Sequence, residues 1–557
     1  MVSRTLPAHR IHALRGARRL AKAAGRIAEH PRPVLATIVA AQLVLTGALS
    51  RSVNHNGWIF YQGGDQIWYT TTGWLETRGE LAYTFVGYGW SLILAPITAL
   101  MGPDFVSVLP PTILLQILLF GPLLTLCIYC LGAELAGRVV GLWAAALWVA
   151  LPFLAIPLFV ERYHKTYVDQ VLPQALGLTA MADFPSMVAV TVSALLVLRS
   201  IRRGVVNEAL LAGLVAGFAA GMKPSNYLFL AGPAAAFALA RRPREGAAFA
   251  AALLPASVAL VAWKLRGLGE LPLLALGTTK LAAGTTVPIA SWWSHVPFDW
   301  HQLDKNMDFL REFFFSNRVV QWAPLAGALP LLRRTRPGAG LVLGWFLAYV
   351  IVKGTSPVAS IERGDFWRLV MPAFPAFVLL VAFAPLCVPS LYRRVAAQAA
   401  PRARPLGTRI VVVAALALAV VPLAAAGLTQ QLTDARHAVI LDDILVPVAG
   451  HELTLHARHQ GRSQRLTWDD RTAARRAFYR VYRTKGGGPD VLCGRAGSGS
   501  LRCELNMTVL ETTRQRSYVD RSPEPDATYR VGVAANWLDD TSEGDVYLVS
   551  DPVRAAP

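Results

Sequence analysis

The residues of this 557-residue chain that could do chemistry stand at the borders of long apolar stretches. Asp65 follows two glycines in the segment QGGDQ, Asp183 opens the segment DFP, and Lys223 precedes a proline in GMKPSN. A carboxylate can remove a proton from an attacking hydroxyl group, and a cation can stabilise a phosphate that departs with negative charge. These residue types therefore suit the transfer of a group from a phosphate ester to a hydroxyl acceptor.

A fourth segment of the same kind, SIERGDFWR, brings Arg363 and Arg368 to the start of another apolar stretch. Each position taken alone also has a simpler interpretation. Asp65 and Asp183 could cap the helices that follow them, and the stem of Lys223 could extend along apolar surface to reach water. The chemical interpretation is favoured because four separate segments carry carboxylates and cations at comparable places.

The composition indicates what kind of protein must position these residues. Hydrophobic residues make up 54% of the sequence and charged residues only 16%, which leaves too little polar surface to cover a soluble protein of this length. We expect the excess apolar surface to face lipid. The predicted fold is an all-α polytopic membrane domain followed by a small mixed α/β domain.

Apolar runs long enough to cross about 30 Å of hydrocarbon occur eleven times. They cover residues 34–49, 105–131, 138–160, 184–198, 205–222, 225–240, 246–263, 318–332, 338–353, 369–389 and 409–427. Several runs are short, and only Lys223 and Pro224 separate two of them, so the count could be wrong by one or two. An odd number of spans places the C-terminal tail on the opposite side of the membrane from the N-terminus.

Positive charge is concentrated on alternate connections between these runs. The connections are residues 1–33, 132–138, 199–208, 241–246, 333–336 and 391–409. They hold 23 of the 54 Lys and Arg residues but only 4 of the 35 Asp and Glu residues, and so carry the whole net charge of +19. Because such charge marks the cytoplasmic side, we expect a plasma-membrane protein with a cytoplasmic N-terminus and an extracytoplasmic tail. This pattern also argues against nucleic acid as a partner.

Three segments on the predicted outer side, residues 51–104, 161–183 and 264–317, are long enough to form a site. Apolar residues recur at helical spacing from 66 to 78, which predicts a helix lying along the membrane interface. Aromatic residues are frequent in the first and third segments, among them Tyr69, Tyr88, Trp292 and Trp293. They could line a groove for the acceptor or a lipid substrate, or form the aromatic belt common at membrane interfaces.

The tail, residues 428–557, has a different composition. Gly, Asp and Thr are frequent, and alternating segments such as YRVGV predict strands, while residues 467–482 favour a helix. Cys493 and Cys503 flank a turn rich in Gly and Ser and are predicted to form a disulfide in an oxidising compartment. The other three cysteines lie in apolar runs and are interpreted as core residues, and the irregularly spaced histidines of the tail do not favour a metal site.

The chain resembles the GT-C superfamily of membrane glycosyltransferases that use polyprenyl-phosphate sugars, which includes protein mannosyltransferases, aminoarabinose transferases and actinobacterial arabinosyltransferases. The resemblance rests on the order of its motifs: an acidic residue opening an outer helix, then Asp-x-Pro, Lys-Pro and an arginine-led span. Asp65, Asp183, Lys223 and Arg368 stand at these places. The resemblance covers about residues 34–427. The predicted domains are a basic cytoplasmic segment (residues 1–33), a transmembrane catalytic domain (34–427) and a soluble extracytoplasmic domain (428–557).

By this resemblance, Asp65 is the general base and Asp183 a second acid that supports the acceptor or the donor. The residues expected to hold the donor phosphate are Lys223, Arg363, Arg368, His164 and Lys165. The last two could equally belong to a solvated loop surface. Many relatives have a second acid where Gln66 stands here, so a divalent metal is conceivable but not supported, and no cofactor is predicted with certainty.

The sequence thus predicts an integral membrane glycosyltransferase that moves a sugar from a polyprenyl-phosphate donor to a glycan, lipid or protein acceptor of the cell envelope. Frequent Ala and Arg favour a high-GC bacterium, and hence arabinose or mannose as the sugar. The alternative is a transporter or flippase of lipid-linked saccharides. The predicted spans carry no ionisable residue near their middle, which argues against transport. A third possibility, an anchor that only displays the tail, would not need eleven spans.

Overall fold

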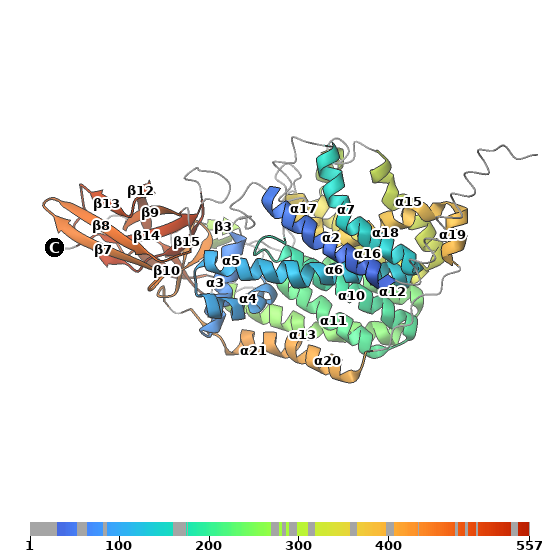
Figure 1. The fold of residues 1–557 in the computed structure, drawn as a ribbon. Helices are drawn as coiled ribbons and strands as arrows, with labels where there is room; N and C mark the ends of the chain where they lie inside the picture. The colour runs from blue at the N-terminus through green and yellow to red at the C-terminus, as the bar shows by residue number, and fades with distance from the viewer. Residues whose placement is uncertain are drawn as a thin grey trace, which may run out of the picture.

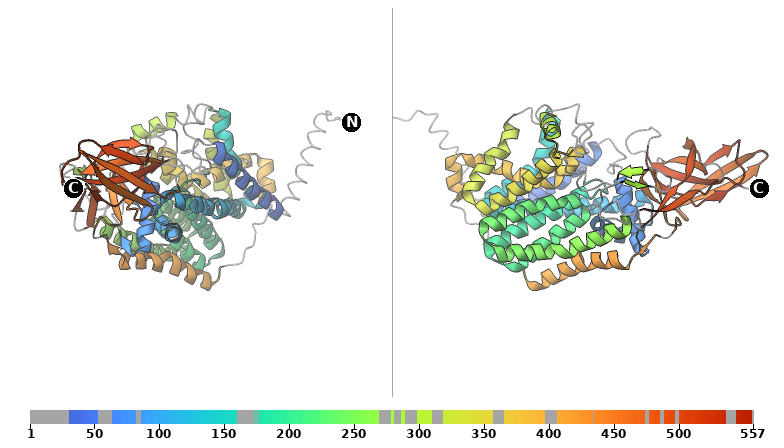
Figure 2. Two further views of the ribbon diagram at one scale, coloured as in Figure 1. Left: turned by 60° about the vertical axis from the view of Figure 1, so that its left-hand side comes forward. Right: turned by 180° about the vertical axis from the view of Figure 1, so that it is seen from behind.

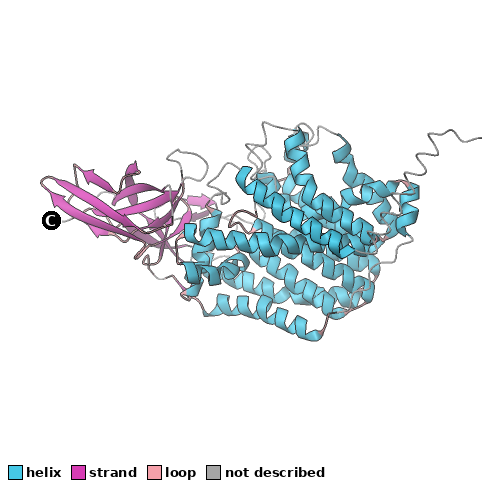
Figure 3. Ribbon diagram, viewed as in Figure 1, coloured by secondary structure: helices cyan, strands magenta, loops and turns pink. Residues whose placement is uncertain are grey.

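The computed structural model describes most of the chain. The described residues are 31–52, 64–81, 86–159, 174, 177–268, 278–280, 286–288, 298–309, 318–356, 365–396, 406–432, 434–473, 477–484, 488–496, 500–535 and 544–555. Helices dominate as far as Leu428, and strands dominate beyond it (Figures 1 and 3). The β-rich part projects from one end of the helical part, as the view from behind in Figure 2 also shows.

The first helices of the chain lie partly beside the β-rich part and partly within the helical bundle (Figure 1). They are α2 (Pro31–Ser52), α3 (Asp65–Thr77), α4 (Tyr88–Met101), α5 (Phe105–Leu115) and α6 (Gly121–Ala136), with a π-helical turn, η1 (Gln116–Phe120), between the last two. The predicted outer helix at 66–78 is confirmed as α3. It is not an exposed interfacial helix, however, because every residue from Gln66 to Leu75 is buried.

The remaining helices complete the bundle. They are α7 (Arg138–Phe159), α10 (Asp183–Arg203), α11 (Val206–Met222), η2 (Pro224–Leu230), α12 (Ala231–Ala240), α13 (Pro243–Leu268), α14 (Trp300–Phe309), α15 (Arg318–Arg334) and α16 (Arg336–Gly354). They continue with α17 (Asp365–Val370), η5 (Met371–Ala373), α18 (Phe374–Phe383), η6 (Ala384–Cys387), α19 (Pro389–Ala396), α20 (Thr408–Ala415), η7 (Leu416–Val420) and α21 (Val421–Leu428). A short hairpin of β2 (Thr278–Lys280) and β3 (Thr286–Pro288) lies between α13 and α14.

Helices occupy all eleven ranges in which spans were predicted, but the number eleven is not confirmed. Within the described residues, seven helical stretches are long and apolar enough to cross a membrane. They are Pro31–Ala48, Phe105–Ala136, Asp183–Arg203, Pro243–Gly267, Arg336–Gly354, Arg368–Cys387 and Thr408–Leu428. Other apolar helices, such as α11 and α12, are shorter because Pro and Gly interrupt the regular backbone at their ends.

Burial identifies the centre of the bundle. The span formed by α10 is 83% buried inside the protein, whereas only 11% of the span in α2 and 22% of the span in α20–α21 are buried. The core around α10 includes large aromatic side chains such as Trp148 and Trp345, both fully buried. A residue at the first turn of α10 is therefore held by packing on several sides.

From Ala438 onward, the described residues of the tail form three β-sheets. Its strands are β5 (Ala438–Leu441), β6 (Ile444–Pro447), β7 (Leu453–Gln460), β8 (Ser463–Asp470), β9 (Ala477–Thr484), β10 (Val491–Ala496), β11 (Ser500–Leu505), β12 (Met507–Thr513), β13 (Ser517–Asp520), β14 (Thr528–Ala535), β15 (Val546–Val549) and β16 (Val553–Arg554). The sheet orders are β10-β11-β5-β6, β12-β9-β14-β15 with β16 on β14, and β13-β8-β7. The predicted mixed α/β fold is wrong, because the described residues of the tail contain only strands and turns.

The helix predicted at 467–482 is the clearest error. The structure has the end of β8 and most of β9 there, and β9 pairs with both β12 and β14. Its buried residues mimic helical spacing because a central strand buries both faces. Tyr479 and Val481 enter one hydrophobic cluster, while Phe478 and Tyr482 enter another.

Two short strands join the tail to the segment that follows α3. β1 (Glu80–Leu81), directly after α3, pairs in parallel with β4 (Gln430–Gln431), directly after α21. His437 Nδ1 lies 2.8 Å from a carboxylate oxygen of Glu80 and reinforces this junction. The tail is therefore attached to α3 as well as to the last helix.

Candidate active site

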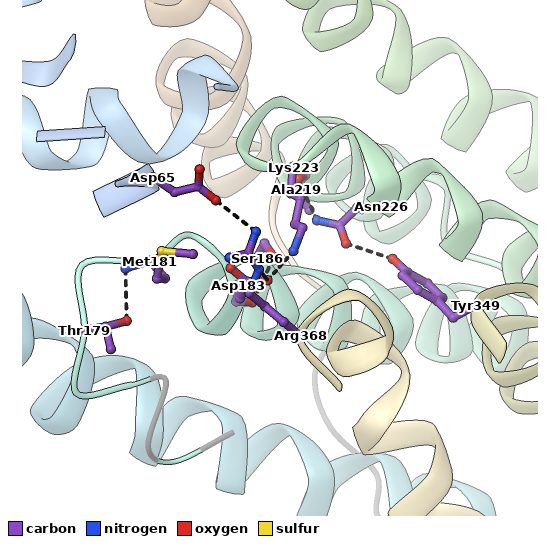
Figure 4. A network of polar contacts seen from close by, with 10 residues as sticks. All are labelled: Asp65, Thr179, Met181, Asp183, Ser186, Ala219, Lys223, Asn226, Tyr349 and Arg368. Carbon is purple, nitrogen blue, oxygen red and sulfur yellow. Dashed lines mark hydrogen bonds and ion pairs between the residues drawn. The ribbon is translucent and has the colours of Figure 1, made fainter. Parts of the chain in front are cut away.

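Asp65 is the first residue of α3 and does not act as its cap. Gly64 occupies the N-cap position, and the N-terminus of α3 has no capping hydrogen bond from a side chain. The Asp65 carboxylate instead accepts a hydrogen bond from Arg368, with 2.9 Å between Oδ2 and Nη2 (Figure 4). An acidic residue in the first helical turn is also favoured by the helix dipole.

Asp183 and Lys223 form a buried ion pair. Asp183 is the first residue of α10, where Ala182 is the capping residue, and its Oδ1 accepts a close hydrogen bond from Lys223 Nζ. Lys223 has extended backbone between α11 and η2 because the following Pro224 disfavours a helical conformation at this position. The break between the two helices thus directs an ammonium group to the start of a third.

Arg368 links the two carboxylates. It belongs to α17, and its Nε lies 3.9 Å from Asp183 Oδ1 while its Nη2 binds Asp65. Residues from four segments that are far apart in sequence therefore meet in one network, as Figure 4 shows. We refer to Asp65, Asp183, Lys223 and Arg368 as the bridged cluster.

Exposure differs sharply across the bridged cluster. The Asp65 side chain is 32% exposed and that of Arg368 24%, whereas Lys223 is 14% and Asp183 only 3% exposed. An incoming molecule can therefore reach the Asp65 carboxylate, while Asp183 is covered. The two acids therefore have different surroundings: Asp65 is accessible, whereas Asp183 is buried against the two cations.

Tyr69 forms part of the wall of this site. It lies one turn after Asp65 on α3 and is buried. Burial raises the pKa of its hydroxyl well above 10, and the nearby Asp65 and Asp183 raise it further. Tyr69 is therefore a neutral hydroxyl beside the two carboxylates, which is consistent with its predicted place near a substrate.

Tyr88, the other tyrosine predicted to line a groove, is placed differently. It is 1% exposed and its ring packs edge-on against Phe218 and Trp263. Its hydroxyl donates to the backbone oxygen of Ala256 at 3.3 Å. These contacts favour a packing function between α4, α11 and α13.

Two residues that the sequence did not single out fix the segment around Lys223. Asn226 donates through its backbone N–H to the Lys223 carbonyl at 2.9 Å and through Nδ2 to the Ala219 carbonyl at 2.8 Å. Its side-chain oxygen accepts from the Tyr349 hydroxyl of α16 at 2.8 Å (Figure 4). An Asn and a Tyr within apolar runs are the only sequence signal for this arrangement.

Gln66 stabilises the segment that precedes Asp183. Its side-chain oxygen accepts a hydrogen bond from the backbone N–H of Ala180 at 2.8 Å, and the residue is fully buried. The Gln66 side-chain oxygen therefore accepts a structural hydrogen bond and does not act as a metal ligand here. Among the described residues there is no group of three His, Cys, Asp or Glu that could hold a metal ion.

The tail packs directly behind Asp65. A side chain at Gly64 would meet Ile444 of β6, since a Cβ there would lie 2.7 Å from Ile444 Cγ1. Trp68 Nε1 donates to the Asp443 carbonyl at 2.9 Å. One hydrophobic cluster contains Ile67 of α3, Phe366 of α17 and strand residues of the tail. The elements that carry Asp65 and Arg368 are therefore both supported by the β-rich part.

The remaining predicted residues have separate outcomes. The disulfide between Cys493 and Cys503 is present and joins β10 to β11. The others lie outside the described residues, and their functions remain predictions: His164, Lys165, Trp292, Trp293 and Arg363.

Comparisons with known proteins give little further guidance. The chain matches no model of a known protein family, and no curated protein matches it in sequence. Among solved structures it is similar to the oligosaccharyltransferase AglB of Archaeoglobus fulgidus, in complex with an inhibitory peptide and a dolichol-phosphate (TM-score 0.36, 14% identity), with Zn and sulfate (0.36, 15%) and in the apo form (0.35, 14%). The matches cover 70–71% of this chain but only 52–55% of those chains. A similarity this distant identifies neither a family nor a function.

Proposed function

We propose that this protein is an integral membrane glycosyltransferase that transfers a sugar, arabinose or mannose, from a polyprenyl-phosphate donor to a hydroxyl acceptor of the cell envelope. The observation that carries the proposal is the bridged cluster: a reachable carboxylate, held by a guanidinium, beside a buried ion pair. The bundle of apolar helices would hold the lipid chain of the donor. The extracytoplasmic face is the proposed location of the reaction.

In the proposed reaction, Asp65 is the general base. Its carboxylate takes the proton of the acceptor hydroxyl as the hydroxyl oxygen attacks the anomeric carbon of the sugar. The bond between that carbon and the phosphate oxygen breaks, and the electron pair leaves with the lipid phosphate. Arg368 and Lys223 are the cations that stabilise the charge on the departing phosphate.

Asp183 has a positioning function in this proposal. Its carboxylate is almost fully buried and contacts both cations, so it fixes their orientation and balances their charge before the donor binds. A preorganised site of this kind does not have to rearrange during the reaction. The extended backbone at Lys223 and the hydrogen bonds of Asn226 hold the ammonium in the same way.

The test is the variant Asp65→Asn, which keeps the shape of the side chain and removes the base. We expect it to lower sugar transfer by about a hundredfold or more while the protein stays folded and binds donor. Release of polyprenyl phosphate from a panel of polyprenyl-phosphate sugars measures the rate. Asp434→Asn, an exposed carboxylate in the tail that pairs with Arg436, is the matched control. Unchanged turnover in Asp65→Asn would overturn the assignment of the base.

A further inference from the structure

A lysine lies at the end of α16, the helix that packs against η2 and α17. Lys353 is the last basic residue of this helix and is partly buried. It stands one turn beyond Tyr349, whose hydroxyl binds Asn226, and Asn226 in turn binds the backbone of Lys223. Residues four apart lie on the same face of a helix, so Lys353 is on the face that approaches Lys223.

The surroundings of Lys353 are electropositive. Helix α16 packs against η2, the 3-10 turn that begins directly after Lys223. Helix α17, which carries Arg368, also packs against α16. Within the described part of the chain, Lys353 has no carboxylate at ion-pair distance, in contrast to Lys223 and Arg368, which both contact Asp183.

Ser225 adds an unused hydroxyl to the same segment. It lies between Lys223 and Asn226 in η2, and its Oγ is buried without a hydrogen-bond partner among the described residues. A buried hydroxyl that makes no hydrogen bond is costly, as is a partly buried cation beside another cation. Both costs are removed when an anion with several acceptor oxygens binds.

We propose that Lys353 and Ser225, together with Lys223, form the subsite for the phosphate group of the lipid-linked substrate. A phosphate ester has the required negative charge and oxygen acceptors, and an ammonium group binds it as a compact charge. This inference rests on the proposed function, which supplies the sugar that the phosphate carries. Binding of the phosphate group itself can be measured without sugar transfer.

A snorkelling lysine is the competing explanation for Lys353. Lysines at helix ends commonly extend their stems along apolar surface to reach water. That explanation accounts for neither the nearby Lys223 nor the unpartnered Ser225 hydroxyl. It also predicts that a neutral side chain of similar length would leave phosphate binding unchanged.

The experiment measures binding of undecaprenyl phosphate to the purified full-length protein, with undecaprenol and inorganic phosphate as separate ligands. We expect Lys353→Gln to weaken binding of the lipid phosphate about tenfold or more and to leave undecaprenol unaffected. Lys353→Arg should retain part of the affinity, and Ser225→Ala should show a smaller loss. Lys305→Gln, an exposed lysine on the neighbouring α14, is the matched control.

The outcomes separate this inference from the proposed function. Equal affinity of Lys353→Gln and the unmodified protein for undecaprenyl phosphate, at unchanged thermal stability, would overturn the subsite. Loss of binding in Lys353→Gln together with no sugar transfer by the unmodified protein would support the subsite and overturn the proposed function. Inorganic phosphate that competes with the lipid phosphate would show that the subsite recognises the phosphate group, and failure to compete at any concentration would contradict this.

Discussion

Two buried charge networks lie at the two ends of α10, and they are built differently. At the end of α10, the Glu134 carboxylate of α6 contacts Arg199, Arg202 and Arg203, and Arg203 also pairs with Glu208. At the start of α10 lies the bridged cluster, in which Asp183 contacts Lys223 and Arg368. Both networks place carboxylates against cations, so the presence of ion pairs alone does not identify a site.

The difference lies in connectivity and access. The three arginines that contact Glu134 come from one five-residue stretch of α10, residues 199–203, and the side chains of Glu134 and Glu208 are 4% and 0% exposed. The bridged cluster draws its four residues from four separate segments and leaves Asp65 32% exposed. The network around Glu134 stabilises the packing of helices, whereas the bridged cluster holds a reachable carboxylate in a fixed position.

The largest effect on activity within this comparison, after that of Asp65→Asn, is expected for Asp183→Asn. The substitution leaves Lys223 and Arg368 without the carboxylate that they share, so their charges are no longer positioned for the phosphate. We expect the rate of sugar transfer to fall by about a hundredfold or more. The measurement is release of lipid phosphate at saturating donor, and a rate within a few-fold of the unmodified protein would contradict the positioning function.

Glu134→Gln should lower the stability of the protein but leave its rate of sugar transfer unchanged. It removes a carboxylate that contacts all three arginines of α10, and breaking a buried ion pair costs about 3 kcal/mol or more of stability. The rate per folded molecule should stay the same because the network lies at the far end of α10 from Asp65. Thermal unfolding in detergent, with activity measured on the folded fraction, checks both parts. A selective loss of activity at unchanged stability would erase the distinction between the two networks.

A smaller effect is expected where the tail supports the site. Trp68→Phe keeps the ring packing but removes the hydrogen bond from Nε1 to the Asp443 carbonyl, which is worth about 1 kcal/mol. Because Trp68 follows Asp65 by one turn of α3, we expect a several-fold decrease in kcat with little change in KM. The control is Trp322→Phe, an exposed tryptophan on α15. Identical kcat values for the two variants would mean that the tail does not position Asp65.

The sequence was informative wherever a property depends on local pattern. Asp65, Asp183, Lys223 and Arg368 could be predicted to lie on one face from the order of the apolar runs and the positive charge on alternate connections. The disulfide of Cys493 and Cys503 was readable from the short turn between them, and the structure contains it.

What the sequence could not supply were contacts between distant segments. The hydrogen bond between Tyr349 and Asn226 and the packing of Ile444 against Gly64 depend on how helices and sheets come together. The strand β9 was mistaken for a helix because it buries both faces. Tyr88 could be predicted only as part of a groove or of an aromatic belt, and its packing against Phe218 and Trp263 depends on contacts between helices.

The most direct test of the account uses the unmodified full-length chain in liposomes with a polyprenyl-phosphate sugar and a hydroxyl acceptor. The measurement follows free polyprenyl phosphate and the glycosylated acceptor together. The account predicts that the two products appear in equal amounts. Movement of the lipid-linked sugar across the bilayer with neither product formed would contradict it and would identify the protein as a transporter instead.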